Sequence, residues 1–206
     1  MSTHSSIDQI LKVGLPIYFL LFFGIAFVIK SLVVAKRIGK NPVVLPKDDS
    51  AYGLIGIYFK LTMLGLLSYT LLYSFLPNSD NYLLPISILE NQSLQYSGMG
   101  IMLVALIWTL IAQNHMKESW RIGIDMETET ELITKGLFGI SRNPIFLGMI
   151  ISLIGLFLLT PNTWTLLFMI LGYVLIQIQI RLEEAHLIKK HGAEYLKYKM
   201  NVRRLL

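Results

Sequence analysis

Residues 143–180 read NPIFLGMIISLIGLFLLTPNTWTLLFMILGYVLIQIQI and contain no charged residue over 38 positions. One helix of this length would measure roughly 57 Å at about 1.5 Å per residue, whereas the hydrocarbon core of a bilayer is about 30 Å thick. Pro161, Asn162 and Thr163 lie in its middle, and proline followed by small polar residues commonly interrupts helices. The segment therefore predicts a tight hairpin of two membrane-spanning helices, residues 144–160 and 164–180.

Three further apolar runs precede this hairpin. They cover residues 13–29, with a continuation beyond Lys30 to Ala35; residues 61–77, with an apolar start near Tyr52 broken only by Lys60; and residues 91–116. A membrane-spanning helix needs about 20 predominantly apolar residues, and each run approaches that length. The first run is too long for the apolar part of a cleaved signal peptide. We therefore predict one all-α polytopic membrane domain over residues 1–206, with five transmembrane helices.

The composition agrees with a membrane protein. Hydrophobic residues make up 54% of the 206 residues and charged residues only 15%, a balance that argues against both a soluble globular domain and a disordered chain. The chain has no cysteine, which excludes disulfides, thiolate catalysis and cysteine-ligated zinc. The four histidines show no metal-ligand spacing, so no metal site is predicted. No glycine-rich dinucleotide fingerprint follows a strand-like segment, and Gly98 is expected to let helices pack closely.

The basic residues predict the orientation in the membrane. Most of the 18 lysines and arginines lie in residues 36–47, 117–142 and 181–204, whereas residues 78–96 contain none. Lysine and arginine favour the cytoplasmic side, and five helices place these three basic segments on one side. We therefore expect an integral protein with its N-terminus outside and its C-terminus cytoplasmic. The many isoleucine, lysine and asparagine residues are typical of a bacterial source, so the expected location is the inner or plasma membrane of a bacterium.

Two polar segments flank the predicted hairpin and carry the candidate chemistry. Before it, Gly136 and Gly139 give backbone freedom just ahead of Arg142-Asn143-Pro144. Proline suits the first turn of a helix, and a helix N-terminus beside an arginine attracts carboxylates or phosphates.

After the hairpin come the adjacent carboxylates Glu183 and Glu184. Neighbouring helical residues point about 100° apart, so the two cannot face one pocket equally. Either both belong to a solvated helix end, or one faces inward while the other meets solvent or Arg181. Gln179 and Glu183 are four positions apart and so share one helix face.

Together, these segments resemble the isoprenylcysteine carboxyl methyltransferase family, which is related to phospholipid methyltransferases. Gly136-Leu137-Phe138 followed by Arg142-Asn143-Pro144-Ile145-Phe146-Leu147-Gly148 is similar to the family pattern G-x-Y-x-x-x-R-[HN]-P-x-Y-x-G. The paired-glutamate ending of the family is similar to the segment that begins at Glu183-Glu184 and continues to His191-Gly192-Ala193-Glu194-Tyr195-Leu196-Lys197-Tyr198. A further segment of bacterial members is similar to Ser119-Trp120-Arg121-Ile122-Gly123. The specific region covers residues 119–203.

The resemblance implies an integral membrane methyltransferase that uses S-adenosylmethionine and acts on a lipophilic or membrane-resident acceptor. Carried over by position, the implied cofactor contacts are Asp125, Thr130, Glu131, Leu132, Ile133, Phe138, Asn143, Pro144, Ile145, Phe146 and Glu183. Arg142 is implied to shape the pocket or to meet the cofactor's carboxylate. Glu184 and Arg121 are implied to face substrate or to support Glu183, as is Gln179, and the implied partners include membrane lipids but no nucleic acid and no metal.

This chain departs from the family pattern at two of these positions and differs from eukaryotic members at a third. Phe138 and Phe146 replace common tyrosines, and Asn143 stands where eukaryotic members have histidine. The departures leave a prenylated-protein substrate less supported than the cofactor. Two other functions remain open: an NADPH-dependent membrane enzyme resembling sterol reductases, and a non-enzymatic membrane scaffold whose basic rim binds a partner or anionic lipid.

Overall fold

The computed structural model describes residues 2–44, 48–77, 80–123 and 131–206. The elements in chain order are α1 (Ser2–Phe23), a π-helical segment η1 (Gly24–Ile29), α2 (Lys30–Ile38), β1 (Val43–Val44), α3 (Ala51–Phe75), α4 (Asp80–Leu83), η2 (Ser87–Leu89), α5 (Gln92–Met116), η3 (Lys117–Ser119), β2 (Ile122–Gly123), η4 (Gly136–Gly139), α6 (Pro144–Leu159) and α7 (Thr163–Asn201). The predicted all-α class is confirmed: the strands among these elements are one short parallel pair, β1 with β2.

Four helices in the described part of the chain are long and apolar enough to cross a membrane. They are Asp8–Ile38, Ala51–Phe75, Gln92–Ser119 and Thr163–Asn201, whereas α6 belongs to the shorter apolar helices. With 16 residues, α6 falls below the length of about 20 that an untilted span needs. The five-helix count therefore stays a prediction. Helix α7, at 39 residues, exceeds the bilayer core by far; its uncharged part ends at Ile180, so Arg181 and the residues after it lie beyond the spanning part.

Polar caps set the beginnings of three of these helices. The side chains of Ser50 and Asn91 accept hydrogen bonds from backbone amides in the first turns of α3 and α5. Asn162 and Thr165 form a reciprocal capping box that starts α7 directly after α6 has ended. Because each side chain satisfies an amide that the helix itself cannot pair, these boundaries follow from local sequence.

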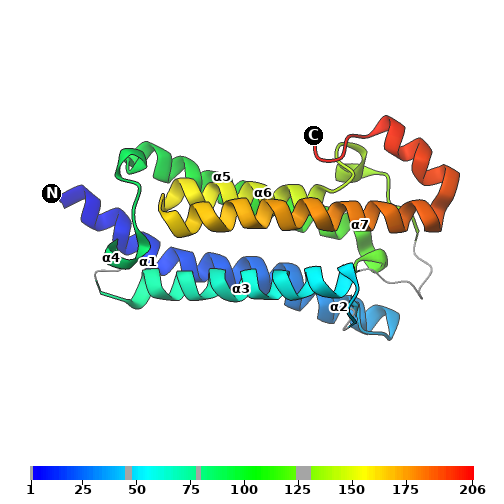
Figure 1. Ribbon diagram of the computed structural model, residues 1–206, viewed down its shortest axis with the longest axis horizontal. Helices are drawn as coiled ribbons and strands as arrows, with labels where there is room; N and C mark the ends of the chain where they lie inside the picture. The colour runs from blue at the N-terminus through cyan, green and yellow to red at the C-terminus, as the bar shows by residue number, and fades with distance from the viewer. Residues whose placement is uncertain (1, 45–47, 78–79, 124–130) are drawn as a thin grey trace.

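The helices form two layers (Figure 1). Helices α1 and α3 pack together in one layer, and α5, α6 and α7 form the other, with α3 packing on α7. Helices α5 and α6 approach most closely where they carry glycine: a Cβ on Gly148 would lie 2.2 Å from the Thr109 hydroxyl oxygen, and one on Gly98 2.6 Å from the Gly155 carbonyl oxygen. The prediction that Gly98 allows close helix packing is confirmed.

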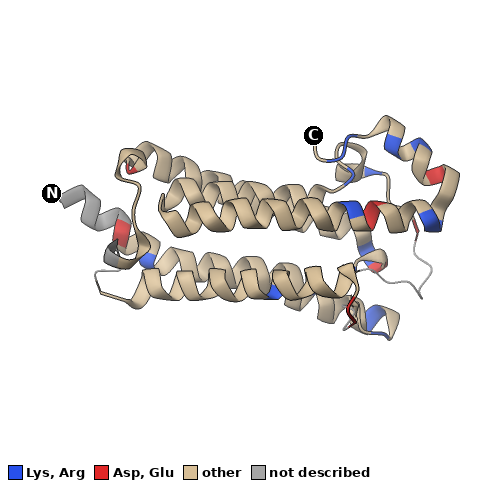
Figure 2. Cartoon of the chain, in the orientation of Figure 1, with Lys and Arg blue, Asp and Glu red and all other residues tan. Residues whose placement is uncertain are grey.

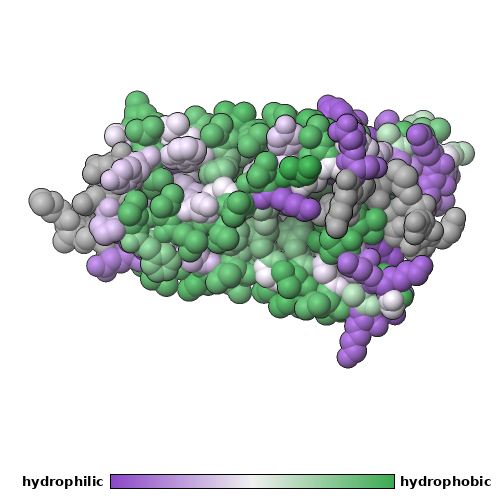
Figure 3. Space-filling view, turned by 60° about the horizontal axis from the view of Figure 1, so that its bottom comes forward, coloured by the Kyte–Doolittle hydropathy of each residue, from purple (hydrophilic) through white to green (hydrophobic). Residues whose placement is uncertain are grey.

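The surface separates into an apolar body and one end, the charged end, where most of the charged residues gather. Large apolar side chains such as Leu20, Leu64 and Val104 are more than half exposed along the body, and hydrophobic residues cover most of the face shown in Figure 3. Charged residues gather where α2 ends and α7 extends beyond the bundle (Figure 2). The β1–β2 pair joins the loops after α2 and α5 at this same end. An apolar belt with one charged rim is the surface expected of a membrane protein.

Candidate active site

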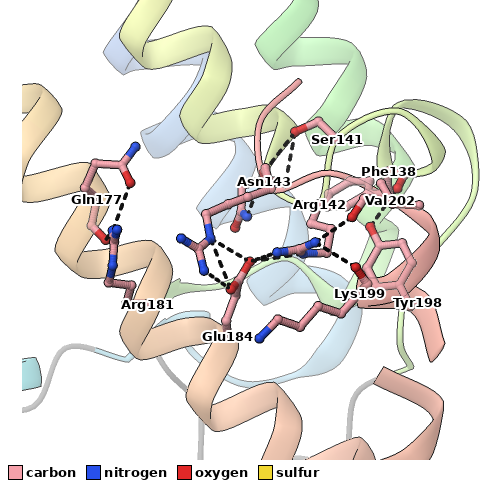
Figure 4. Close-up of polar contacts among 11 residues, drawn as sticks. Phe138, Ser141, Arg142, Asn143, Gln177, Arg181, Glu184, Tyr198, Lys199 and Val202 are labelled. Atoms are coloured by element: carbon pink, nitrogen blue, oxygen red, sulfur yellow. Dashed lines mark hydrogen bonds and ion pairs between the residues drawn. The ribbon is translucent and has the colours of Figure 1, made fainter. Parts of the chain in front are cut away.

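The two polar segments that flank the hairpin meet through one arginine. Arg142 donates from Nε and Nη2 to Oε1 of Glu184 at 3.0 and 2.8 Å, and from Nη1 to the backbone carbonyls of Lys199 and Val202 (Figure 4). The side chains of Arg142 and Glu184 are only 7% and 5% exposed. The structure therefore brings together two candidate residues that lie 42 positions apart in the sequence.

A second arginine, which the sequence analysis missed, completes this cluster. Arg204 donates from Nη2 to Oε2 of Glu184 at 3.0 Å and from Nε to both carboxylate oxygens. Burial by itself would raise the pKa of Glu184, but the hydrogen bonds from Arg204 and Arg142 outweigh it and lower the pKa. The hydrogen bonds that Arg204 donates to Glu184 also raise the pKa of Arg204. Glu184 is therefore an ionised, buried carboxylate with both oxygens bound, not a solvated helix end.

The chain reaches this position because α7 breaks at Gly192. Gly192 has φ 53° and ψ −123°, a backbone conformation that side chains other than glycine's rarely allow. The segment after it folds back toward the start of α6 (Figure 1). There Tyr195 and Tyr198 are buried edge-to-face at 5.9 Å, and the Tyr198 hydroxyl donates to the carbonyl of Phe138 at 2.6 Å. The glycine within a helical pattern was the one sequence signal for this turn.

The first turn of α6 has an unusual cap. Asn143 occupies the N-cap position, yet its side chain makes no capping hydrogen bond. Its Nδ2 instead donates to the Arg204 carbonyl at 3.0 Å, and the Ser141 hydroxyl contacts the same oxygen at 3.4 Å. Pro144 follows at the first helical position and has no N–H. The amides of the next residues therefore receive no partner from Asn143, which leaves the positive end of the helix dipole open.

Glu183 lies beside this region and differs sharply from Glu184. It is half-buried, and Oε1 accepts a hydrogen bond from Nε2 of Gln179 at 2.8 Å. Burial raises the pKa of the Glu183 carboxyl to about 7, although the Gln179 hydrogen bond opposes the shift. Two predictions are thereby confirmed: Gln179 and Glu183 share a face, and the paired glutamates do not face one pocket equally.

The other candidates are more scattered. Phe138, Asn143 and Pro144 are buried, whereas Leu132, Ile133, Ile145 and Phe146 are half-buried and Glu131 is exposed. The carbonyl of Pro144 accepts a hydrogen bond from the indole of Trp108 at 2.8 Å, which fixes the helix start against α5. Arg121 donates from Nη1 to the carbonyls of Glu118 and Trp120 in its own loop.

Two of the predicted cofactor contacts, Asp125 and Thr130, lie outside the described residues. Within those residues, no group of three or more histidine, aspartate or glutamate side chains could hold a metal ion.

An apolar cavity lies between the two helix layers, within the belt. Its wall comes from α1, α3, α5, α6 and α7: Leu15, Tyr18, Phe19, Phe22, Phe23, Phe59, Thr62, Met63, Leu66, Thr70, Met102, Met149, Ser152, Leu153, Leu156, Gly172 and Ile176. A polar contact in the wall is made by the Tyr18 hydroxyl, which donates to the Met102 carbonyl at 2.9 Å and lies 2.9 Å from the Ser152 hydroxyl. Met149 also lines the cavity and is five residues beyond Pro144 on α6, so the cavity begins about 7.5 Å from the start of that helix.

Comparison with known proteins gives one match. Residues 93–194 match the family model of phospholipid methyltransferase, in agreement with the resemblance of the two motifs. The matched region begins at the start of α5, well before the motifs themselves, and includes the contact surface between α5 and α6. No curated protein and no solved structure matches the chain. The match and the apolar helices together indicate an integral membrane methyltransferase.

Proposed function

We propose that this protein belongs to the phospholipid methyltransferase family and transfers a methyl group from S-adenosylmethionine to a lipophilic or membrane-resident acceptor, as isoprenylcysteine carboxyl methyltransferases do. The observation that carries the proposal is the buried contact between Arg142 and Glu184, at 2.8 Å. It unites the segments before and after the hairpin into one site, at the charged end of an apolar bundle. A polar cofactor can reach this end from water, while an apolar acceptor remains in the membrane.

The residues at this end fit the cofactor's chemical groups. S-adenosylmethionine supplies an electrophilic methyl group on a positively charged sulfur. The uncapped first turn of α6, from Asn143 to Phe146, suits a carboxylate because backbone amides and the helix dipole attract negative charge. Glu183 offers a carboxylate that no arginine occupies among the described contacts. The rings of Phe138 and Phe146 can stabilise a cation, and Asp125 together with residues 130–133 is proposed to complete the binding loop.

Arg142 and Glu184 are best assigned to shaping the pocket. Three nitrogens of Arg142 are already bound to Glu184 and to two backbone carbonyls, and both oxygens of Glu184 are bound to arginines. Such saturated groups orient the chain but have few bonds left for a ligand. Methyl transfer is an in-line displacement that depends on alignment and exclusion of water, so a rigid polar frame is suited to it. For Arg121, a role toward the acceptor remains part of the proposal.

The cavity between the layers supports a lipophilic acceptor. Aromatic side chains of Phe22 and Phe59 and the thioether of Met149 line it, and it begins about 7.5 Å from the start of α6. We further propose that α6 crosses the membrane as a fifth, short span beside α5. The charged end would then be cytoplasmic and the N-terminus outside.

Binding of S-adenosylhomocysteine to the detergent-purified protein tests the proposal. Calorimetry should detect binding in the micromolar range, and a parallel thermal-shift assay with NADPH should show no stabilisation. Incubation with methyl-labelled S-adenosylmethionine and membrane extract should then place the label in a lipid-extractable product. Stabilisation by NADPH together with undetectable S-adenosylhomocysteine binding at millimolar concentration would contradict the proposed function.

A further inference from the structure

We infer that Arg204 is a positioning residue, which keeps the first turn of α6 open for the cofactor by holding the C-terminal segment, residues 202–206, against it. The inference rests on the proposed function and assigns a role to a residue outside both recognised motifs. It also lies outside the matched family region, which ends at residue 194.

The C-terminal segment contacts the start of α6 through its backbone. The Arg203 carbonyl accepts from the amide of Arg142 at 2.9 Å, and the Arg204 carbonyl accepts from Nδ2 of Asn143 at 3.0 Å. The Val202 carbonyl accepts from Nη1 of Arg142. Any residue could supply these carbonyls, so by themselves they do not fix which part of the tail lies there.

The side chain of Arg204 supplies that specificity. It forms an ion pair with Glu184 of α7 at 3.0 Å, and its side chain is 35% exposed, whereas that of Glu184 is 5% exposed. Arg142 already neutralises Glu184, so a second guanidinium is not needed to stabilise that charge. The ion pair between Arg204 and Glu184 instead fixes a position. It holds the C-terminal segment against α7 at the level where this segment crosses Arg142 and Asn143. Within α7, just before this segment, the Tyr198 hydroxyl donates to the Phe138 carbonyl and so holds the end of the helix in place.

This arrangement decides where the side chain of Asn143 lies. Asparagine is among the preferred N-cap residues because its Oδ1 accepts from an amide in the first helical turn. In this chain the tail takes up the Asn143 amide group, and no capping bond forms. The backbone of Asn143 has φ −132° and ψ 56°, whereas the capping residues Asn91 and Asn162 are extended. If the tail moved away, a change of ψ toward the extended region together with a side-chain rotation would let Asn143 cap α6. It would then occupy amides that the proposed function assigns to the cofactor.

The test compares Arg204→Gln with Arg203→Gln. Both remove one positive charge from the tail and leave the backbone carbonyls in place, but the Arg203 side chain is exposed and forms no ion pair that the structure shows. S-adenosylhomocysteine affinity, measured by calorimetry well below the unfolding temperature, should fall about fivefold in Arg204→Gln, the factor that corresponds to an N-cap bond of about 1 kcal/mol. Arg203→Gln should bind like the wild type, and Arg204→Lys should recover most of the affinity.

Three further readouts separate positioning from a general loss of stability. In methyl-transfer assays, KM for S-adenosylmethionine should rise in Arg204→Gln while kcat at saturation stays within about twofold, because the competing cap is displaced by cofactor. In an Asn143→Ala background, where no side chain can cap, Arg204→Gln should have little effect on affinity. Equal affinities of Arg204→Gln and Arg203→Gln, or an undiminished effect in the Asn143→Ala background, would overturn the inference. A wild-type protein that binds no S-adenosylhomocysteine would refute the proposed function itself, and the inference with it.

Discussion

Replacement of Glu184 by glutamine should destabilise the protein strongly. The change leaves two guanidinium groups facing a neutral amide, and Arg142, at 7% side-chain exposure, cannot be hydrated there. Breaking a buried ion pair by removing one partner costs about 3–5 kcal/mol. Glutamine keeps one acceptor oxygen, and Arg142 keeps its carbonyl partners, so we expect the lower end, about 3 kcal/mol. For a chain of this length that corresponds to a fall of about 6–12 °C in Tm.

Glu183→Gln is the matched control one residue away on the same helix. It loses only a charge-assisted bond from Gln179 in a half-buried position, so Tm should fall by no more than about 4 °C. Cofactor affinity should show the opposite ranking: Glu183→Gln should weaken S-adenosylhomocysteine binding at least about tenfold. Thermal unfolding in detergent, followed by intrinsic fluorescence, measures the first quantity and calorimetry the second. A Glu184→Gln protein whose Tm lies within about 2 °C of the wild type, a shift that corresponds to no more than about 1 kcal/mol, would refute the reasoning.

Three further predictions follow from other parts of the structure. Gly148→Ala should lower the free energy of unfolding by about 1–3 kcal/mol, because its Cβ would lie 2.2 Å from the Thr109 hydroxyl, whereas Gly100→Ala, with no atom within 4 Å, should be neutral or slightly stabilising in the same thermal assay. Affinity for S-adenosylmethionine should fall severalfold from pH 8 to pH 6, since Glu183 with a pKa of about 7 is ionised above and neutral below that value; a Glu183→Gln protein with the same pH dependence would exclude this residue as the cause. Gly192→Ala should cost about 1–3 kcal/mol through backbone strain alone, because nothing lies within 4 Å of the added Cβ, and it should also weaken S-adenosylhomocysteine binding by displacing the C-terminal segment, as calorimetry would show.

Length and apolarity were enough to predict most of the fold. Residues 13–29 and 91–116 form helices within α1–η1 and α5, and the break at Pro161 and Asn162 falls between α6 and α7. These outcomes depend on local sequence, on the absence of charge and on side chains that cap the next helix. The number of spans was less predictable, because α6 is shorter than a bilayer requires and its placement depends on packing against α5.

Only the part of the candidate site that lies within the two sequence motifs was predicted. The Gln179–Glu183 contact follows from helical spacing and was foreseen. Whether Glu184 is solvated or buried could not be decided from its own helix, because the answer depends on Arg142 and Arg204, which come from other segments. Arg204 itself gave no signal. Its position requires the turn at Gly192, and a basic residue near a chain end is ordinarily a solvated charge.

A buried cluster of two arginines and one carboxylate is a poor means of stabilising a protein. Well-packed apolar side chains of the same volume often give equal or greater stability, because they avoid the cost of desolvating ions. Apolar packing does not provide the directional hydrogen bonds that fix one segment of the chain relative to another. Arg142 presents several donors in one plane, and the structure engages them with Glu184 and with the carbonyls of Lys199 and Val202. This geometry fixes α7, the C-terminal segment and the start of α6 in one register, so that Asn143 faces the tail and leaves its own helix uncapped. Stability alone would favour the capped helix; an open helix end, held by buried ions, is the arrangement that favours a ligand.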